Sequence, residues 1–305
     1  MKKTMLRIIL FLLVTMLLCQ ASAQGLPIYY QLGTKAPEVD EVEFIAHCPF
    51  EEDEAILTID FLGIYRGDSI VISCGGKRML IDGGPEFKIG AVERYLQFNQ
   101  IEGKDAFDAF LLTHAHDDHI EVPGILLGKG YQPAVQYSPY NLESTYELWR
   151  QYVPKLEKSG IEHRKLVTGD VIDFGGAKMT VWRWDKKGID INNHCLVTMV
   201  EFGDAKILLT ADIGADAQKW MLENFDHSLF KSDIYKIPHH GIDRLFYPYF
   251  DTVAPQLVII TNQKSSAERL EKALQNRRVP RYYINRTIRL ETNGKLWYVT
   301  TQPAP

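Results

Sequence analysis

Cysteine is scarce in this 305-residue chain, and long apolar runs are almost absent. The four cysteines have no close spacing, which excludes a disulfide framework and a CxxC-type metal knot. The longest apolar run, residues 8–18, has about half of the ~20 residues that a membrane-spanning helix needs. No internal repeat and no Pro/Ser-rich linker divides the chain. With 46% apolar and 24% charged residues, the composition is that of a globular protein.

An excess of positive charge is also missing. The formal net charge is −5, and the first 23 residues contain Lys2, Lys3 and Arg7 without any acid, so the remainder is more negative still. A uniformly basic surface that follows a nucleic-acid backbone is therefore not expected, although local basic patches stay compatible with this charge.

The N-terminus has the pattern of an export signal. A positive start precedes the apolar run, and Ala21, Ser22 and Ala23 form a small-residue cleavage site. We predict a signal peptide over residues 1–23 and a periplasmic or extracellular protein with no transmembrane segment after signal removal. Cys19 raises a lipoprotein as the alternative, but Leu18 stands where such signals place Gly, Ala or Ser. After cleavage three cysteines remain, and the sequence does not select a disulfide pair among them: Cys48, Cys74 and Cys195.

Regular patterns begin after a polar, acidic lead-in over residues 24–54, which we predict to be irregular or extended. Apolar alternation and turn dipeptides predict strands at 56–64, 69–74, 78–81, 106–112, 134–137, 171–174, 178–184, 196–202, 206–210, 234–237 and 256–261, with a last hairpin at 293–294. Helical spacing predicts helices at 87–99, 122–127, 144–156, 215–224 and 267–276. The strands form two groups, each followed by helices, which predicts two sheets packed face to face with helices outside, an αββα sandwich over residues 55–305.

The strongest functional signal is a run of imidazoles and carboxylates directly after an apolar strand. Residues 114–119 read His-Ala-His-Asp-Asp-His. Neutral imidazole and carboxylate are ligands that zinc-like cations prefer, and a segment leaving a rigid strand can aim several of them at one point. His114 and His116 can face one ion, while Asp118 and His119 can face a second. The run therefore predicts a metal site.

Three other segments place an ionisable side chain beside a predicted strand. Asp212 follows an apolar strand and is suited to bridge two cations. His239 and His240 follow the strand at 234–237, and His194 precedes the strand at 196–202. Each group lies where a core strand stops or starts, as expected for a site at one end of a sandwich.

These segments, taken in order, resemble the metallo-β-lactamase superfamily. The resemblance is carried by residues 114–119, Ile81-Asp82-Gly83-Gly84, Asp212 and His239-His240-Gly241. More narrowly, the turn at 67–69 and the segments 81–84, 192–197 and 208–212 resemble the hydrolase domain of competence DNA-uptake channels, and phosphorylcholine esterases of bacterial surfaces share this pattern. The resemblance covers about residues 56–299 and implies the αββα metallo-β-lactamase sandwich.

The resemblance also implies residue roles. One metal ion would be bound by His114, His116 and His194, the other by Asp118, His119 and His240, with Asp212 bridging. Asp82 would hold the 114–119 segment through hydrogen bonds, with an ordinary turn residue as the alternative. We expect Asp118 and His239 to be catalytic, although the assignments of His239 and His240 can be exchanged. The cofactors would be two divalent ions, zinc first, with manganese or iron as alternatives.

Two departures from the family pattern bear on these roles. The competence-type turn usually reads Gly-Gln-Gly-Asp, whereas this chain has Tyr65-Arg66-Gly67-Asp68, which is also compatible with an ordinary β-turn. The Thr-Pro-Gly-His-Thr segment that often carries the third ligand is missing, so His194 is placed by position alone.

The predicted activity is hydrolysis of a phosphodiester or related ester by a metal-activated hydroxide. Asp212 is an oxygen ligand where several lactam-cleaving relatives use cysteine, and relatives with this aspartate frequently act on phosphoesters. The substrate would be a small molecule or a surface polymer, and nucleic acid is not favoured. The alternatives are a lactam, lactone or thioester hydrolase and a non-catalytic exported metal-binding module. The oligomeric state is left open.

Overall fold

The structure is a computed structural model that describes residues 28–32, 50–51, 53–139 and 146–301. These residues form two mixed sheets. The first sheet has nine strands in the order β1 (Ile28–Leu32), β16 (Trp297–Thr301), β15 (Ile288–Thr292), β2 (Leu57–Phe61), β3 (Ser69–Cys74), β4 (Lys77–Asp82), β5 (Ala109–Leu111), β6 (Val135–Pro139) and β7 (Glu162–Leu166). The second has seven, in the order β14 (Arg281–Tyr283), β13 (Leu257–Ile260), β12 (Ile234–Lys236), β11 (Ala205–Leu209), β10 (Val197–Phe202), β9 (Ala177–Trp182) and β8 (Val171–Phe174).

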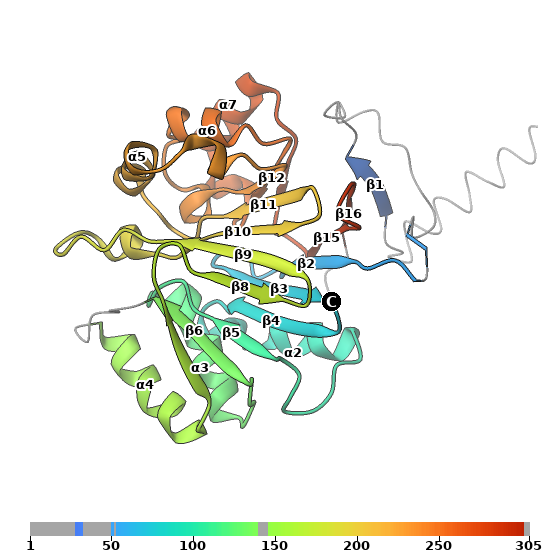
Figure 1. Ribbon diagram of the computed structural model, residues 1–305, viewed down its shortest axis with the longest axis vertical. Helices are drawn as coiled ribbons and strands as arrows, with labels where there is room; N and C mark the ends of the chain where they lie inside the picture. Colours follow the sequence, from blue (N-terminus) through green and yellow to red (C-terminus); the bar gives the residue numbers. More distant parts are fainter. Residues whose placement is uncertain (1–27, 33–49, 52, 140–145, 302–305) are drawn as a thin grey trace, which may run out of the picture.

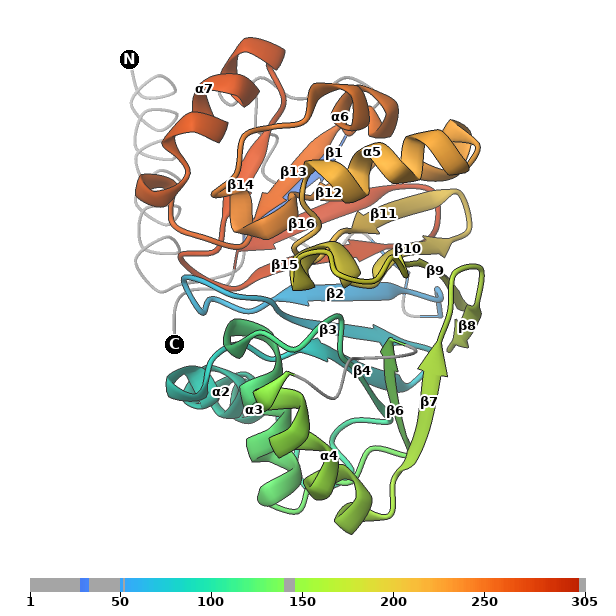
Figure 2. The ribbon, with the colours of Figure 1, turned by 90° about the vertical axis from the view of Figure 1, so that its left-hand side faces the viewer.

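Helices cover the outer face of each sheet. Those on the first sheet are α2 (Ile89–Phe98), α3 (Asp117–Gly128) and α4 (Glu147–Ser159), and those on the second are α5 (Ala215–Asn224), α6 (Tyr247–Val253) and α7 (Glu268–Arg277). Figures 1 and 2 show the two sheets between these two helical layers. The fold is the predicted αββα sandwich.

Side chains alternate between the two faces of the second sheet, and apolar residues lie on both faces. On β13, Leu257 and Ile259 belong to the core between the sheets, whereas Val258 and Ile260 belong to the core beneath α5, α6 and α7. Successive side chains of a strand point to opposite faces. An unbroken apolar strand is therefore needed wherever a sheet is covered on both sides, which is why these strands read as continuous hydrophobic runs.

Several elements differ from the sequence prediction. Ile28–Leu32, within the lead-in expected to be irregular or extended, pairs antiparallel with β16 at the edge of the first sheet. The strands β7 and β14 and the helix α6 were not predicted, because they are short and β7 and β14 expose polar residues. The helix α3 begins at Asp117 rather than near Val122, so the acidic and histidine residues of the 114–119 run lead into its first turn.

Two cysteines can be assigned. Cys74 and Cys195 are both buried and free, so they do not form a disulfide with each other. Cys48 and the predicted signal peptide lie outside the described residues. In the part of the chain that the structure describes, no helix combines the length and apolar character needed to cross a membrane.

Glycines bring the hairpin turns of the two sheets into contact at one end of the sandwich. A Cβ atom on Gly175, in the β8–β9 turn, would lie 2.0 Å from the carbonyl oxygen of Cys74, next to the β3–β4 turn. A Cβ on Gly203, in the β10–β11 turn, would lie 2.8 Å from the carbonyl oxygen of Gly294 in the β15–β16 turn. Both contacts need positions without a side chain. The sheets thus meet backbone to backbone at this end.

A buried carboxylate links α2 to the first sheet. Asp60 on β2 is fully buried and accepts hydrogen bonds from Tyr95 Oη (2.6 Å), Arg289 Nε (2.7 Å) and Arg289 Nη2 (2.9 Å). Arg289 lies on β15, which pairs with β2. One carboxylate therefore fixes a helix and two neighbouring strands.

Removing this carboxylate should destabilise the fold. Asp60→Ala leaves the Arg289 guanidinium without its partner, and breaking such a buried pair costs about 3 kcal/mol. The measurement is the urea midpoint at unchanged m-value. Glu162→Ala is the matched control, since it breaks the exposed Glu162–Arg164 pair and should cost less than about 1 kcal/mol. Equal losses in the two variants would contradict this assignment.

Candidate metal centre

Ionisable side chains collect at the end of the sandwich opposite the glycine contacts. Asp82 ends β4, and the 114–119 run follows β5. Asp212 follows β11, and His240 follows β12 in the short turn Pro238–Gly241. Asp68 directly precedes β3. The loops at this end therefore bring residues from both sheets together.

Two groups of potential ligands form there, and they share one carboxylate. One group contains His114, His116 and Asp212, and the other contains Asp68, His119, Asp212 and His240; within each group one ligand atom per residue lies within 4.8 Å of all the others. The Nε2 atoms of His119 and His240 are each 3.1 Å from Asp212 Oδ2, and His114 Nε2 is 3.9 Å from the same oxygen. Asp212 thus stands between the groups, as expected for a bridging residue.

Asp118 lies beside the second group. Its Oδ2 is 3.4 Å from His240 Nε2, and its Oδ1 is 3.7 Å from His119 Nε2. Its side chain is 10% exposed, whereas those of His119 and His240 are essentially buried. Asp118 therefore occupies the solvent side of the centre.

The chemistry of the donor set fits metal ions. Among the described residues, three buried atoms of the centre have no hydrogen-bond partner: Asp68 Oδ1, Asp212 Oδ1 and His240 Nε2. Buried polar atoms without partners are costly and rare. Carboxylate oxygens and imidazole nitrogens that converge in this way are the ligands of zinc-like cations. A bound cation would satisfy them.

Hydrogen bonds at the far side of three of the four ligand-group imidazoles set their direction. His119 Nδ1 is 2.8 Å from Asp82 Oδ2, His240 Nδ1 is 2.9 Å from Thr261 Oγ1, and His114 Nδ1 is 3.0 Å from Thr113 Oγ1. In each case Nε2 is left for the centre, which is how metal-binding histidines are oriented in proteins.

Asp82 acts as the predicted anchor of the 114–119 segment. Its carboxylate accepts hydrogen bonds from the Thr113 backbone N–H (2.9 Å) and hydroxyl (2.7 Å) as well as contacting His119. Full burial raises the pKa of Asp82, and the neighbouring His119 partly opposes that rise. Asp82 contacts Nδ1 of His119 and is not a member of either ligand group. Its φ of 53° places it in the left-handed region.

Strained backbone is concentrated at this end of the sheets. Asp82, Ala211, His239 and His240 all have positive φ, between 43° and 54°. Such conformations are unfavourable for residues other than glycine and cluster at functional sites, where the surrounding structure enforces them. The fold therefore enforces the positions of these side chains against local preference.

Carboxylates control the charge of the buried imidazoles. Burial alone would lower the pKa of His119, but the carboxylates of Asp212 and Asp82 raise it well above its usual value. Burial likewise opposes the charged form of His240, while Asp212 and Asp68 raise its pKa to about 10. In His114, by contrast, burial is the dominant influence and lowers the pKa well below the usual value. The second group is thus the more negative environment.

The sequence analysis missed two residues of the centre, Asp68 and Lys236. The fully buried Nζ of Lys236 lies 2.5 Å from Asp68 Oδ2 and 3.7 Å from Asp212 Oδ1, and it donates to the carbonyl oxygen of Ala211 at 2.7 Å. Burial raises the pKa of Asp68, but Lys236 and His240 more than reverse this, so it is held well below its usual value. The sequence does contain a signal for Lys236, because it lies within the predicted apolar strand at 234–237. A lysine buried in a strand needs a partner of opposite charge.

His194 differs from the prediction, because the structure does not bring it into either ligand group. Its Nε2 is 2.9 Å from the carbonyl oxygen of Lys186, and its Nδ1 is 3.3 Å from Nη2 of Arg183. A neutral imidazole satisfies both contacts by donating from Nε2 and accepting at Nδ1. Position along the chain placed His194 near the centre, but these contacts turn its ring toward the 183–186 segment.

The structure also separates the two adjacent histidines. His240 enters the second ligand group, whereas His239 does not. His239 is 25% exposed, with Nδ1 2.7 Å from Asp243 Oδ2 and Nε2 3.4 Å from Asn192 Nδ2. This geometry favours His240 as the ligand and leaves His239 at the solvent edge.

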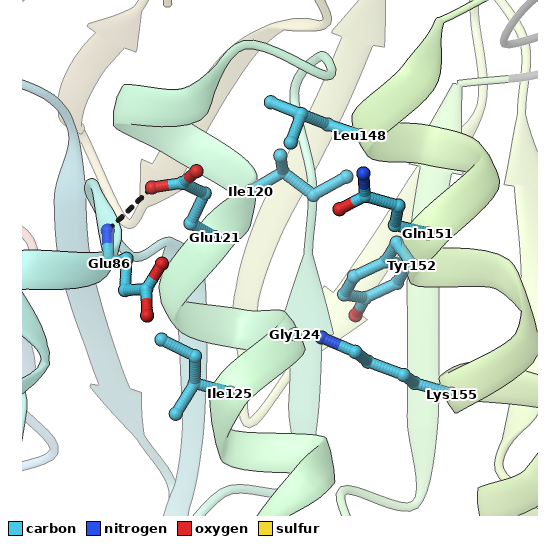
Figure 3. A pocket seen from close by; sticks show the side chains of 9 residues that line it. All are labelled: Glu86, Ile120, Glu121, Gly124, Ile125, Leu148, Gln151, Tyr152 and Lys155. Carbon is cyan, nitrogen blue, oxygen red and sulfur yellow. Dashed lines mark hydrogen bonds between the residues drawn. The ribbon is translucent and has the colours of Figure 1, made fainter.

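A separate hollow lies between α3 and α4 and contains none of the ligand candidates. Figure 3 shows residues of α3 facing residues of α4 across it, with the Glu86 N–H donating to Glu121 Oε2 at 2.7 Å. Its volume is 140 Å³. A Cβ on Gly124 would stand 3.3 Å from Tyr152 Cδ2, so the two helices approach each other closely beside the hollow.

Comparisons with known proteins agree with this architecture. No protein-family model matches the chain. The chain is 26% identical to ComE operon protein 3 of Bacillus subtilis (strain 168) over 282 residues, which is 84% of this chain and 34% of that protein. It is 26% identical to the uncharacterized protein YcaI of Escherichia coli (strain K12) over 187 residues, 59% of this chain and 22% of that one. The chain thus spans about a third or less of the length of these curated relatives.

Solved structures identify the fold. The metallo-beta-lactamase fold protein YhfI from Bacillus subtilis superposes with a TM-score of 0.54 at 11% identity, covering 78% of this chain and all of that one. A mutant of the β-hydroxylase CmlA gives 0.50 at 14% identity, covering 80% of this chain and 55% of that one. The chain therefore has the metallo-β-lactamase fold. The predicted resemblance to metallo-β-lactamase proteins is confirmed at the level of the fold, and the chain is similar in sequence to ComE operon protein 3.

Metal content tests the ligand groups. We expect wild-type protein to hold two divalent ions per chain, His240→Ala to lose one, and Asp212→Ala to lose both, because Asp212 is shared. The measurement is elemental analysis of dialysed protein with circular dichroism as a check on folding. His239→Ala and His194→Ala are the matched controls and should retain two ions. A His239 variant that loses metal while a His240 variant keeps it would reverse the assignment.

Proposed function

We propose that this chain is an exported, dinuclear-metal hydrolase that cleaves a phosphodiester or a related ester. The observation that carries the proposal is the sharing of Asp212 by two groups of buried histidines and carboxylates. Of the seven ligands predicted from the sequence, the proposal keeps all but His194, and Asp68 joins them from the structure: His114, His116, Asp118, His119, Asp212 and His240. Export stays a prediction, because residues 1–23 lie outside the described residues.

Metal ions bound at such a centre lower the pKa of a bound water and stabilise the negative charge that develops on the substrate. The residues of this chain supply the remaining steps. Asp118 lies on the solvent side of the centre, where its carboxylate can accept a proton from the attacking water. In this proposal no serine or cysteine nucleophile takes part: burial, followed by the nearby Asp212 carboxylate, raises the pKa of the Cys195 thiol well above its usual value, which keeps it protonated and unreactive.

His239 is proposed to protonate the leaving group. It is a quarter-exposed histidine beside the centre, and its Nδ1 lies 2.7 Å from Asp243 Oδ2. A carboxylate on one ring nitrogen orients the imidazole, so that in this proposal Nε2 donates a proton to the oxygen of the departing alcohol. Asp118 and His239 would thus act at opposite ends of the bond that breaks.

A substrate panel tests the reaction class. We expect metal-loaded protein to hydrolyse bis(p-nitrophenyl) phosphate in preference to nitrocefin, and His116→Ala to lose most of that activity because one ligand group is broken. Preferred turnover of nitrocefin would favour the lactamase alternative. Protein that holds two ions yet turns over no phosphodiester, lactam, lactone or thioester would favour the non-catalytic module. Activity that survives His116→Ala unchanged would contradict the proposed centre.

The role of His239 is tested by the leaving group. His239→Ala should lower kcat by about 10²- to 10⁴-fold, the usual contribution of a general acid, for phosphodiesters with alkyl alcohol leaving groups. The loss should be much smaller for p-nitrophenol, which leaves without protonation. Asp243→Asn should show the same pattern in weaker form, and metal content should stay unchanged. An equal loss for both classes of leaving group would exclude proton donation by His239.

A further inference from the structure

Arg66 is an exposed arginine at the edge of the metal centre. Its side chain is 70% exposed, and its Nε lies 3.4 Å from Asp118 Oδ2. The same carboxylate oxygen is 3.4 Å from Nε2 of the buried His240. Asp118 therefore has a ligand-group histidine on one side and a solvent-exposed guanidinium on the other. Arg66 thus lies on the solvent-exposed side of Asp118.

A role in folding does not explain this arginine. Exposed ion pairs contribute little to stability, because solvent screens them. Among the described residues, Asp118 is the carboxylate that pairs with Arg66. A guanidinium carries five N–H donors in a planar fork, so donors remain for a further acceptor. The charge at this position is thus available to a ligand.

The backbone around Arg66 is held rigidly against α3. The N–H of Asp68 donates to the carbonyl oxygen of Asp118 at 3.1 Å, and Arg66 forms an isolated β-bridge with Asn262. A Cβ on Gly67 would lie 2.6 Å from the Asp118 carbonyl oxygen, so the approach needs glycine. Tyr65 has a φ of 68°, a strained value for a tyrosine. The turn is therefore fixed in a conformation that presents Arg66 beside Asp118.

A second cation lies along the same rim. Lys88 Nζ stands 4.9 Å from the centroid of the Tyr65 ring and 5.3 Å from that of Phe87. Both rings are exposed, at 41% and 78%. The rim beside the turn thus combines positive charge with aromatic surface, although the described chain as a whole is acidic. Negative charge on a substrate would be attracted to this side of the centre.

We propose that Arg66 binds a non-bridging phosphoryl oxygen of the substrate and thereby selects anionic phosphoesters over neutral esters. The inference rests on the proposed function, because it assigns the anionic group of that substrate to a residue of the same site. Arginine matches phosphate geometry with two parallel hydrogen bonds. Its preorganised charge also opposes the negative charge that develops during phosphoryl transfer.

Phosphate binding tests the contact without relying on turnover. Inorganic phosphate is titrated into metal-loaded wild type, Arg66→Gln and Arg66→Lys by calorimetry, with metal content measured on each sample. We expect the Kd for phosphate to rise about 10- to 100-fold in Arg66→Gln, the range for one lost charge-assisted hydrogen bond, and less in Arg66→Lys, which keeps the charge. Arg150→Gln, on the exposed side of α4, is the matched control and should bind as wild type does.

Two results would overturn the inference: wild type that binds no phosphate while holding its metal ions, or Arg66→Gln that binds phosphate as tightly as wild type. Kinetics separate this failure from failure of the proposed function. For bis(p-nitrophenyl) phosphate, Arg66→Gln should lower kcat/KM about 10- to 100-fold, with little change for the neutral ester p-nitrophenyl acetate. If wild type hydrolyses the diester and Arg66→Gln equals it, the contact is wrong and the function stands. If phosphate binding depends on Arg66 but no diester is cleaved, the reaction is wrong and the contact stands.

Discussion

The buried carboxylate of Asp212 is the constraint on which the arrangement of both sheets depends. It is 1% exposed, and its Oδ2 lies 3.1 Å from imidazole nitrogens of His119, carried by the first sheet, and His240, carried by the second. A carboxylate removed from water needs compensating charge. Three further carboxylates are buried around it, and Lys236 provides a single buried ammonium group. The negative excess suits the centre to a divalent cation, and it raises the pKa of the two imidazoles that lie nearest the carboxylates, His119 and His240.

The layers of the fold were predictable because the periodicity is strong. Strands covered on both faces are continuously apolar, and the glycine turns between them mark the hairpins, so most of both sheets and the outer helices follow from pattern alone. Among the missed elements, the strand Ile28–Leu32 has the partner most distant in sequence. Ile28–Leu32 becomes a strand by pairing with β16, nearly the whole chain away, and local composition contains no record of that pairing. The helix α6 has only seven residues, which is too short for helical spacing to be recognised in the sequence.

The metal centre was predictable as far as residue type and strand ends carry the signal. Asp212 and His240 were found because an ionisable group directly follows a buried strand. Asp68 and Lys236 were missed because each has an ordinary alternative, a turn residue and a strand lysine, and only their 2.5 Å contact distinguishes the two. His194 was predicted as a ligand from its position along the chain alone. In the structure its ring faces Arg183, and this orientation depends on tertiary contacts that spacing does not encode.

The backbone contacts at Gly175 and Gly203 have a consequence for the opposite end of the molecule. Because each sheet contributes part of the ligand set, the spacing of the ligands depends on how one sheet lies over the other. Close-packed layers transmit strain rather than absorbing it. A Cβ on Gly175 would stand 2.0 Å from a carbonyl oxygen. A methyl group there would push the two turns apart and change the angle between the sheets. The ligand spacing of the candidate metal centre thus depends on two glycines at the opposite end of the sandwich.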